Sequence, residues 1–235
     1  QDVRRIVGMA SRRRQTLLFS ATLPAEVRDL AEAMLRDPLE VRTAPQATPA
    51  ETVAQSVFHV TRKQKKALLV HLLGRGDMER VIVFTRTKRG ANRLAQDLEK
   101  AGVRAAAIHG NKSQNQREKA LADFKGRRPP VLVATDIAAR GIDVDQVTHV
   151  VNYELPNEPE TYVHRIGRTG RAGLEGEAIA FCDHEEREHL EAIERLLRRA
   201  IERRTDLPSD LPAAEPAAAR PARSAGGGAP RRSPG

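Results

Sequence analysis

Arginines and glycines crowd into one short stretch of this sequence, His164-Arg165-Ile166-Gly167-Arg168-Thr169-Gly170-Arg171. A helix that reached Arg168 would place His164 and Arg168 at i and i+4 on one face, with Arg171 continuing that line just past the helix end. Guanidinium groups suit phosphate oxygens, and glycines let a ligand or another backbone approach closely. A solvated basic helix end is the alternative, but glycines weaken a merely structural helix by up to about 1 kcal/mol each. The stretch therefore predicts a phosphate site.

A second polar group follows the apolar run at 131–134. Thr135 offers a hydroxyl and a backbone N–H beside an expected helix start, and helix N-termini attract phosphate. Asp136 is predicted mainly as the N-cap of that helix. Asp143 lies beyond a glycine and can accept hydrogen bonds from a sugar hydroxyl, although a plain loop carboxylate is the simpler interpretation of this residue alone.

Two further apolar runs are followed by residues that suit a nucleic-acid backbone. Gln114 and Arg117 stand at i and i+3 in the first turn of an expected helix after His109-Gly110, within reach of a backbone phosphate. The run Thr85-Arg86-Thr87-Lys88-Arg89 gives hydroxyls and cations after the strand at 81–84. Three adjacent strand ends of this kind predict a basic, hydroxyl-lined ridge for a sugar-phosphate backbone.

Apolar segments and amphipathic helical segments alternate from residue 57 onward, and these elements must position the polar groups. Strands are expected at 57–60, 81–84, 103–108, 131–134, 147–153 and 178–181, and helices at 62–73, 88–100, 113–125, 137–140, from Pro159, and at 184–203. Continuous apolar strands joined by helices indicate an α/β fold with a parallel sheet covered on both faces. Ligands bind such sheets beyond the carboxyl ends of the strands, which is where the polar groups stand.

The chain divides by composition into four parts. Residues 1–43 contain an expected short buried strand at 15–19, a helix from Pro24 to about Leu35 and a further strand at 39–41, and they are too short to fold alone, so they are interpreted as the end of an upstream domain. Residues 44–53 are a proline-containing linker. Residues 54–205 form the main domain, and 206–235, rich in Pro, Ala, Gly and Arg, are expected to be disordered.

The amino-acid composition indicates the kind of binding partner and the cellular compartment. The net charge of +9 and pI near 10.3 favour a polyanion, and the absence of Trp makes base stacking on aromatic side chains an unlikely mode of recognition. One cysteine, Cys182, excludes an intrachain disulfide and a cysteine-based metal cluster, which suits a reducing cytoplasm. No signal peptide and no apolar run of membrane-spanning length is present.

Two motifs of a self-sufficient nucleotidase are missing from this sequence. It holds neither the phosphate loop G-x-x-x-x-G-K-[ST] nor an acidic magnesium-binding motif. The chain is therefore expected to be an incomplete ATPase that is inactive alone.

The quoted motifs, in this order, resemble those of the second RecA-like domain of DEAD-box RNA helicases. The matching segments are 81–85, 109–117, 134–143 and 164–171, while Ser20-Ala21-Thr22 is similar to the motif that closes the first domain. The run from Ile108 to Gln114 is similar to the bacterial RhlE subgroup. The resemblance implies a RecA-like parallel sheet with helices on both faces, and an ATP-dependent RNA helicase that couples ATP hydrolysis to local duplex unwinding.

The resemblance also implies a role for each matching residue. Arg168 and Arg171 would reach the γ-phosphate of ATP, with Arg171 as the arginine finger, Asp143 would bind the ribose, and His164 would join the interdomain network. Ser20 and Thr22 would couple hydrolysis to unwinding. Thr85, Gly110, Gln114, Arg117, Thr135 and Arg140 would lie at or near the RNA. ATP with Mg²⁺ would be held mainly by the first RecA-like domain, which is the intramolecular partner.

Two other functions remain open from the sequence. A non-catalytic RNA-binding or annealing module with the same fold would bind RNA without ATP. A DNA helicase of the same superfamily is less favoured, because related helicases commonly have Gln at the position of His164. The RNA substrate, the role of the tail and the oligomeric state are left open.

Overall fold

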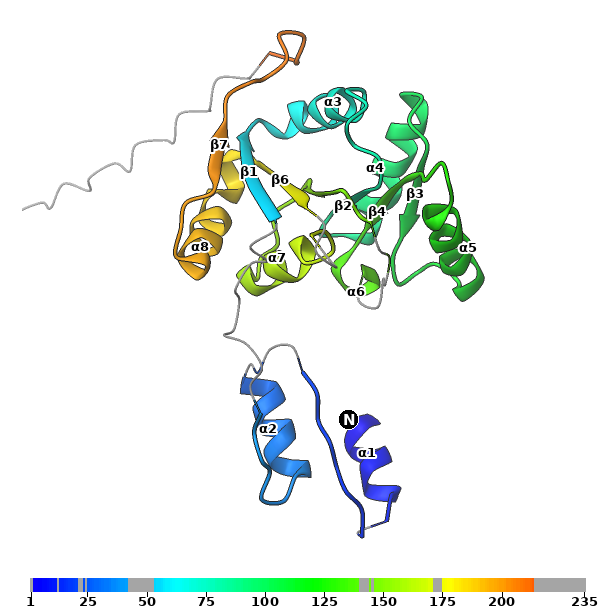
Figure 1. Ribbon diagram of the computed structural model, residues 1–235, viewed down its shortest axis with the longest axis vertical. Helices are drawn as coiled ribbons and strands as arrows, with labels where there is room; N and C mark the ends of the chain where they lie inside the picture. The colour runs from blue at the N-terminus through cyan, green and yellow to red at the C-terminus, as the bar shows by residue number, and fades with distance from the viewer. Residues whose placement is uncertain are drawn as a thin grey trace, which may run out of the picture.

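The computed structural model describes residues 2–11, 13–20, 23, 25–41, 53–139, 144, 146–170 and 175–213. Within these ranges the main domain is a single parallel sheet with strand order β3-β4-β2-β5-β6-β1-β7 (Figure 1). The strands are β1 Val53–His59, β2 Val81–Phe84, β3 Ala105–Ile108, β4 Val131–Ala134, β5 His149–Asn152, β6 Gly176–Cys182 and β7 Glu202–Arg204. The predicted α/β class and parallel sheet are confirmed.

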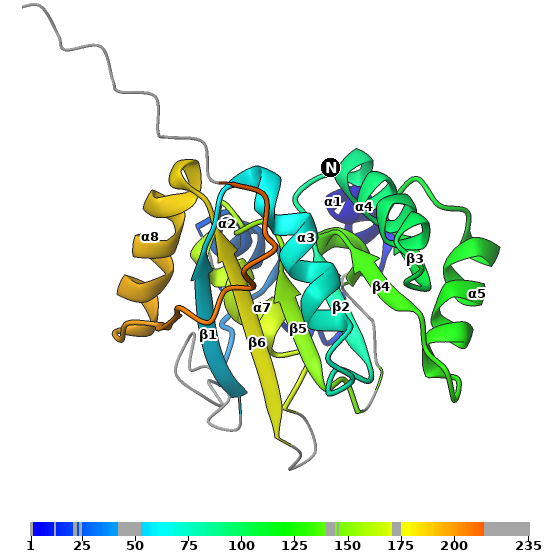
Figure 2. The ribbon, with the colours of Figure 1, turned by 90° about the horizontal axis from the view of Figure 1, so that it is seen from above.

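Helices cover both faces of this sheet, as the view from above also shows (Figure 2). The described helices are α1 Asp2–Met9, α2 Ala25–Met34, α3 Arg62–Leu73, α4 Lys88–Lys100, α5 Gln114–Lys125, α6 Asp136–Ala139, α7 Pro159–Ile166 and α8 Arg187–Leu197, with a 3₁₀ turn, η1, at His184–Glu186. The hydrophobic cores assign α3 and α4 to one face and α5 to α8 to the other. This arrangement leaves the carboxyl edge of the sheet to the loops.

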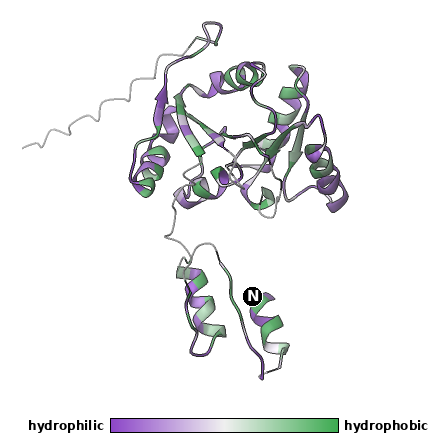
Figure 3. Cartoon of the chain, viewed as in Figure 1, coloured by the Kyte–Doolittle hydropathy of each residue, from purple (hydrophilic) through white to green (hydrophobic). Residues whose placement is uncertain are grey.

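The central strands β2 and β4 are apolar throughout because both of their faces are buried. In β2, Val81 and Val83 pack into the core under α3 and α4, whereas Ile82 and Phe84 pack into the core under α5 and α6. Full burial of each such side chain contributes roughly 1.5–3 kcal/mol. Figure 3 shows the hydrophobic residues of the central strands and the mixed hydrophobic and hydrophilic residues of the surrounding helices.

Capping residues set the helix starts. The Thr87 hydroxyl accepts from the Gly90 N–H at 2.9 Å at the start of α4. Ser113 and Gln116 form a capping box at the start of α5, and Pro159 is the first residue of α7. These caps fix where each helix leaves the carboxyl edge.

The segment before the linker differs from its prediction. Residues 15–19 and 39–41 are not strands, and Leu17 and Phe19 are 68% and 89% exposed. A strand needs a hydrogen-bonded neighbour, and none of the described residues supplies one. The helix predicted between Pro24 and Leu35 is present as α2, but neither α1 nor α2 buries a residue.

The end of the main domain also differs from its prediction. The last helix ends at Leu197 rather than near Arg203, because Arg198 adopts a left-handed conformation with φ of 53°. The chain then forms β7, which pairs in parallel with β1. The described fold continues past the predicted boundary at 205, since the Gln64 side chain donates to the Pro212 carbonyl at 2.8 Å. Residues 214–235 lie outside the described residues.

Candidate functional site

Helix α7 carries the first part of the arginine stretch to the carboxyl edge of the sheet. It ends at Ile166, with the Gly167 N–H donating to the Val163 carbonyl at 3.0 Å, so the helix stops before Arg168. Arg168 nevertheless stays beside His164, because its Nε donates to the His164 carbonyl at 3.4 Å. Both side chains are half-buried.

Arg165, for which the sequence analysis named no role, is the centre of the site. It is 1% exposed, and its guanidinium binds the Asp136 carboxylate through Nε at 2.6 Å and Nη2 at 2.9 Å. Its Nη1 donates to Asn152 Oδ1 at 3.0 Å and to the Glu154 carbonyl at 2.6 Å. The guanidinium also lies 5.0 Å from the centre of the Phe84 ring. One side chain thus joins α7 to α6 and to the ends of β2 and β5.

Asp136 has a different role from the predicted N-cap. It is the first residue of α6, and the backbone carbonyl of Thr135 accepts from the N–H groups of Ala138 and Ala139, both at 3.0 Å. The Asp136 carboxylate is engaged by Arg165 instead. The signal for Arg165 was present in the helix pattern, since Tyr162, Arg165 and Ile166 share the buried face of α7.

A small opening brings together two of the predicted site residues, His164 and Arg168. About 30 Å³ of space is lined by Phe84, Asp136, Ala139, Thr161, His164, Arg165 and Arg168. That volume holds about one water molecule and is far too small for a nucleotide. The opening by itself therefore holds no nucleotide-sized site. Arg171 and Asp143 lie outside the described residues.

The loop after α7 is packed tightly against the amino end of β6. The Thr169 hydroxyl donates to the Val147 carbonyl and also contacts the Thr148 carbonyl at 3.1 Å. Gly176 lies directly against this loop, because a Cβ at residue 176 would overlap the Thr169 hydroxyl and lie 2.5 Å from the Gly170 nitrogen.

Substitution of Gly176 by alanine is expected to lower the free energy of unfolding by about 1–3 kcal/mol, because the added methyl group has no room beside backbone atoms. Denaturant unfolding followed by circular dichroism measures this. Gly167→Ala is the control, since its Cβ would lie 3.3 Å from its nearest neighbour, the Val163 carbonyl oxygen. Equal losses in the two variants would contradict the packing argument.

A second polar group occupies the carboxyl ends of β2 and β3. His109 is buried, its Nδ1 accepts from the Asn111 N–H at 3.3 Å, and its Nε2 contacts Asn92 Oδ1 at 2.9 Å. Burial, followed by repulsion from Lys112 and Lys88, lowers the pKa of His109, so the ring is neutral at pH 7. The Lys88 ammonium donates to Asn111 Oδ1 at 2.8 Å. These contacts hold the turn that carries Gly110.

The predicted RNA-contacting residues differ in how accessible they are. Gly110 and Gln114 are exposed, and the Gln114 amide donates to Glu118 at 2.8 Å. Arg117 is half-buried, and its Nε is buried without an acceptor among the described residues. Thr135 is 6% exposed.

Thr85 cannot be the accessible hydroxyl that the sequence suggested. It is 1% exposed, and its hydroxyl donates to the Thr87 carbonyl at 3.3 Å. Thr87, at the exposed start of α4, is the accessible hydroxyl at this strand end. The chain stays buried for one residue beyond the end of β2, and that residue is Thr85. Arg140 lies outside the described residues.

The remaining predicted site residues belong to the first 43 residues. Ser20 is exposed, and Thr22 lies outside the described residues. Cys182 takes no part in the site, because burial raises the pKa of its thiol to about 11 and keeps it protonated.

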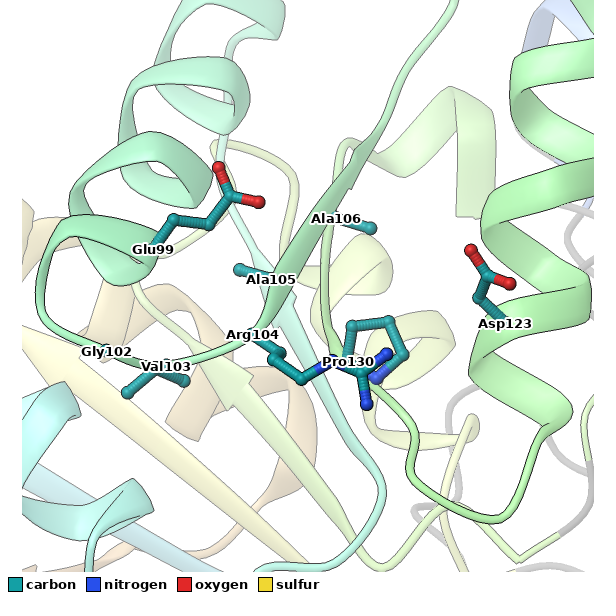
Figure 4. A pocket seen from close by; sticks show the side chains of 8 residues that line it. All are labelled: Glu99, Gly102, Val103, Arg104, Ala105, Ala106, Asp123 and Pro130. Atoms are coloured by element: carbon teal, nitrogen blue, oxygen red, sulfur yellow. The ribbon is translucent and has the colours of Figure 1, made fainter.

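A cleft lies away from these groups. It is an open hollow of about 340 Å³ beside β3, between the end of α4 and α5 (Figure 4). It is lined by Glu99, Gly102, Val103, Arg104, Ala105, Ala106, Asp123 and Pro130. No predicted site residue is among them.

Comparison with known proteins identifies the fold and its family. The family described as the helicase conserved C-terminal domain matches residues 64–173. The DEAD-box ATP-dependent RNA helicases CshA of Geobacillus kaustophilus and Bacillus subtilis are 43% and 42% identical, over 86% of this chain in each case. The chain spans only 44% and 41% of the lengths of those two relatives.

Solved structures agree with this finding. The E. coli DEAD-box protein SrmB, solved bound to regulator of ribonuclease activity A, is 38% identical with a TM-score of 0.63, over 65% of this chain and 90% of that chain. The S. cerevisiae Dbp5 bound to RNA and ADP BeF3 is 32% identical with a TM-score of 0.77, over 85% of this chain and 53% of that chain. The chain belongs to the DEAD-box protein family, and its sheet is the RecA-like domain that carries the C-terminal helicase motifs.

Proposed function

We propose that this chain is the C-terminal part of an ATP-dependent RNA helicase that couples ATP hydrolysis to local unwinding of RNA duplexes. The observation that carries the proposal is the Arg165 network, which holds α7 so that His164 and Arg168 line an opening at the carboxyl edge. The residues proposed to meet RNA follow neighbouring strands at the same edge. The relatives named above are DEAD-box RNA helicases.

The donor set fits the phosphates of ATP but not its metal ion. Arg168 supplies a guanidinium of the kind that binds phosphate oxygens, and Arg171 would add a second. No group of three His, Cys, Asp or Glu side chains able to hold a metal ion is found in the part of the chain that the structure describes. As the resemblance implies, Mg²⁺ and most of the nucleotide are assigned to the first RecA-like domain.

The proposed mechanism assigns one task to each site residue. Bound ATP supplies a phosphoryl group whose charge is stabilised as it is transferred to water. Arg168 and Arg171 would place positive charge beside the transferred oxygens, Asp143 would orient the ribose, and His164 would contact the facing domain. Arg165 would hold Arg168 in place without touching the nucleotide.

RNA would lie along the ridge formed by the carboxyl ends of β2, β3 and β4. Gly110 permits close approach of a phosphate, and Gln114 and Arg117 project from the first turn of α5, whose N-terminus favours an anion. Thr135 and Arg140 would contact the adjacent nucleotides, and Thr87 takes the place first given to Thr85. Backbone contacts of this kind read no sequence, which suits a helicase of broad specificity.

Residues 1–43 are proposed to complete a first RecA-like domain, with Ser20 and Thr22 coupling hydrolysis to unwinding. Support comes from large hydrophobic side chains that are exposed in this segment, namely Val3, Ile6, Met9, Leu17, Phe19, Leu39 and Val41. Such side chains normally pack against other protein. Residues 44–53 would be the linker, and 54–205 with the described extension to 213 would be the second domain.

The subgroup within the DEAD-box family and the cellular compartment are also proposals. The RhlE-like subgroup stays a prediction, since the relatives named above are CshA proteins. No helix in the described ranges has the length and apolar character needed to cross a membrane. A cytoplasmic location is proposed because the presumed substrate is cellular RNA.

RNA-stimulated ATP hydrolysis tests the proposed function. The full-length protein is expected to hydrolyse ATP several-fold faster with RNA than without it, whereas the 235-residue chain alone should be inactive and bind ATP poorly. DNA serves as the comparison polymer. Tight, salt-sensitive RNA binding by the isolated chain, with a full-length protein that has no ATPase activity, would instead favour the RNA-binding module.

A further inference from the structure

Three charged side chains are buried beside the site without belonging to any of the motifs described above. Lys65 comes from α3, Asp183 follows β6, and Glu186 ends the 3₁₀ turn η1. They are 1%, 8% and 1% exposed. Charged groups are rarely buried to this extent unless each has a partner.

The three side chains satisfy one another. The Lys65 ammonium forms ion pairs with the Glu186 carboxylate and, at 3.2 Å, with Asp183 Oδ2. Asp183 Oδ1 accepts from the Glu185 N–H at 3.0 Å, and Glu186 Oε2 accepts from the Asp183 N–H at 3.3 Å. A buried ion pair is often no more stabilising than apolar side chains of similar volume, so stability alone does not explain this cluster.

One oxygen of Glu186 points out of the cluster toward the segment that leads into α7. Glu186 Oε1 accepts from the Leu155 N–H at 3.1 Å, and Arg86 Nη2 lies 3.7 Å from the same oxygen. The neighbouring residue, Glu154, accepts from the Arg86 N–H at 2.7 Å through its carboxylate and from Arg165 through its carbonyl. Residues 154 and 155 are thus fixed by the cluster, by Arg86 and by Arg165.

We propose that Lys65, Asp183 and Glu186 form a positioning cluster for α7, which sets the position of His164 and Arg168 through the Leu155 N–H. The inference rests on the proposed function. None of the three side chains lines the opening beside His164 and Arg168. They are positioning residues because, among the described contacts, Glu186 reaches the segment before α7 through the Leu155 N–H and through Arg86 rather than by touching the opening.

The expected kinetic effect follows from this route. A displacement of about 1 Å in a catalytic group can lower a rate by up to about 10²-fold. Because the nucleotide is proposed to be held mainly by the other domain, loss of the Leu155 anchor should lower kcat and leave the KM for ATP nearly unchanged. A defect of folding alone would lower the amount of active protein without changing the chemistry of the folded fraction.

The test compares variants of the full-length protein at saturating RNA. Glu186→Ala is expected to lower kcat about tenfold, with less than a threefold change in KM. The double variant Lys65→Met/Glu186→Gln removes one positive and one negative buried charge, leaves Asp183 hydrogen-bonded to the Glu185 N–H, and keeps an amide oxygen for the Leu155 N–H. It should retain at least half of the wild-type kcat. Active-site titration corrects each value for the folded fraction.

Glu194→Ala is the matched control. The Glu194 side chain also accepts from a backbone N–H, that of Ile201 at 3.0 Å, but it joins α8 to the segment before β7. This variant should keep the wild-type kcat. In the 235-residue chain, amide hydrogen exchange should rise at Leu155 and α7 in Glu186→Ala, and at Ile201 but not α7 in Glu194→Ala.

The outcomes separate the two proposals. A wild-type full-length protein without RNA-stimulated ATPase activity would overturn the proposed function, while the exchange result would still report on the anchor. An active wild-type protein in which Glu186→Ala and Glu194→Ala have the same kcat, or in which the double variant is as slow as Glu186→Ala, would overturn the positioning role.

Discussion

Replacing Arg165 by methionine is expected to lower the free energy of unfolding of the 235-residue chain by about 3 kcal/mol or more. Methionine can fill part of the volume, but it cannot replace the four hydrogen bonds that the guanidinium makes to Asp136, Asn152 and Glu154. Asn152 is fully buried and would lose its donor, and the Asp136 carboxylate would remain half-buried without its cation.

Urea unfolding, followed by circular dichroism, measures the loss at pH 7. Arg89→Met is the control because Arg89 is exposed at the start of α4, where a surface substitution usually changes stability by less than about 0.5 kcal/mol. Arg165→Lys should recover little of the loss, since an ammonium group cannot reproduce the two-pronged contact with Asp136. If Arg165→Met unfolds at the same urea concentration as Arg89→Met, the network is not a structural centre.

The bounds of some helices and strands could be predicted from the sequence because the residues that determine them are adjacent in the chain. The bounds of β2 and β4 follow from uninterrupted runs of four apolar residues, which two buried faces require. The start of α5 follows from the capping box of Ser113 and Gln116, because capping chemistry is complete within four residues. The position of the site at the carboxyl edge follows from the parallel sheet itself.

The errors concern residues whose environment comes from distant parts of the chain. The burial of Arg165 depends on Asp136, Asn152 and Glu154, which belong to other elements, so the run of arginines alone could not indicate it. Strand β7 has the sequence Glu-Arg-Arg and exists because β1 offers it an edge. The opposite error was made at Leu17 and Phe19, whose apolar run predicted a strand although no described strand pairs with it.

Replacing Arg171 by alanine in the full-length protein is expected to lower the kcat for ATP hydrolysis by about 10³-fold, as loss of an arginine finger does in other nucleotidases. The reason is electrostatic: a guanidinium aimed at the transferred phosphoryl group stabilises charge that develops only in the transition state. The KM for ATP should change much less than kcat, because that charge is absent from the bound substrate.

Two further substitutions make this result specific to the finger. Arg171→Lys keeps the charge but loses the planar fork, so it should recover only part of the rate. Arg168→Ala should also slow hydrolysis, but less. The Arg168 side chain donates to the His164 carbonyl at the end of α7, so part of its role is to hold the helix end. Rates measured at saturating RNA and ATP decide the assignment. If Arg168→Ala is the slower variant, the finger is Arg168, and if neither variant is slowed, the arginine stretch holds the fold rather than the nucleotide.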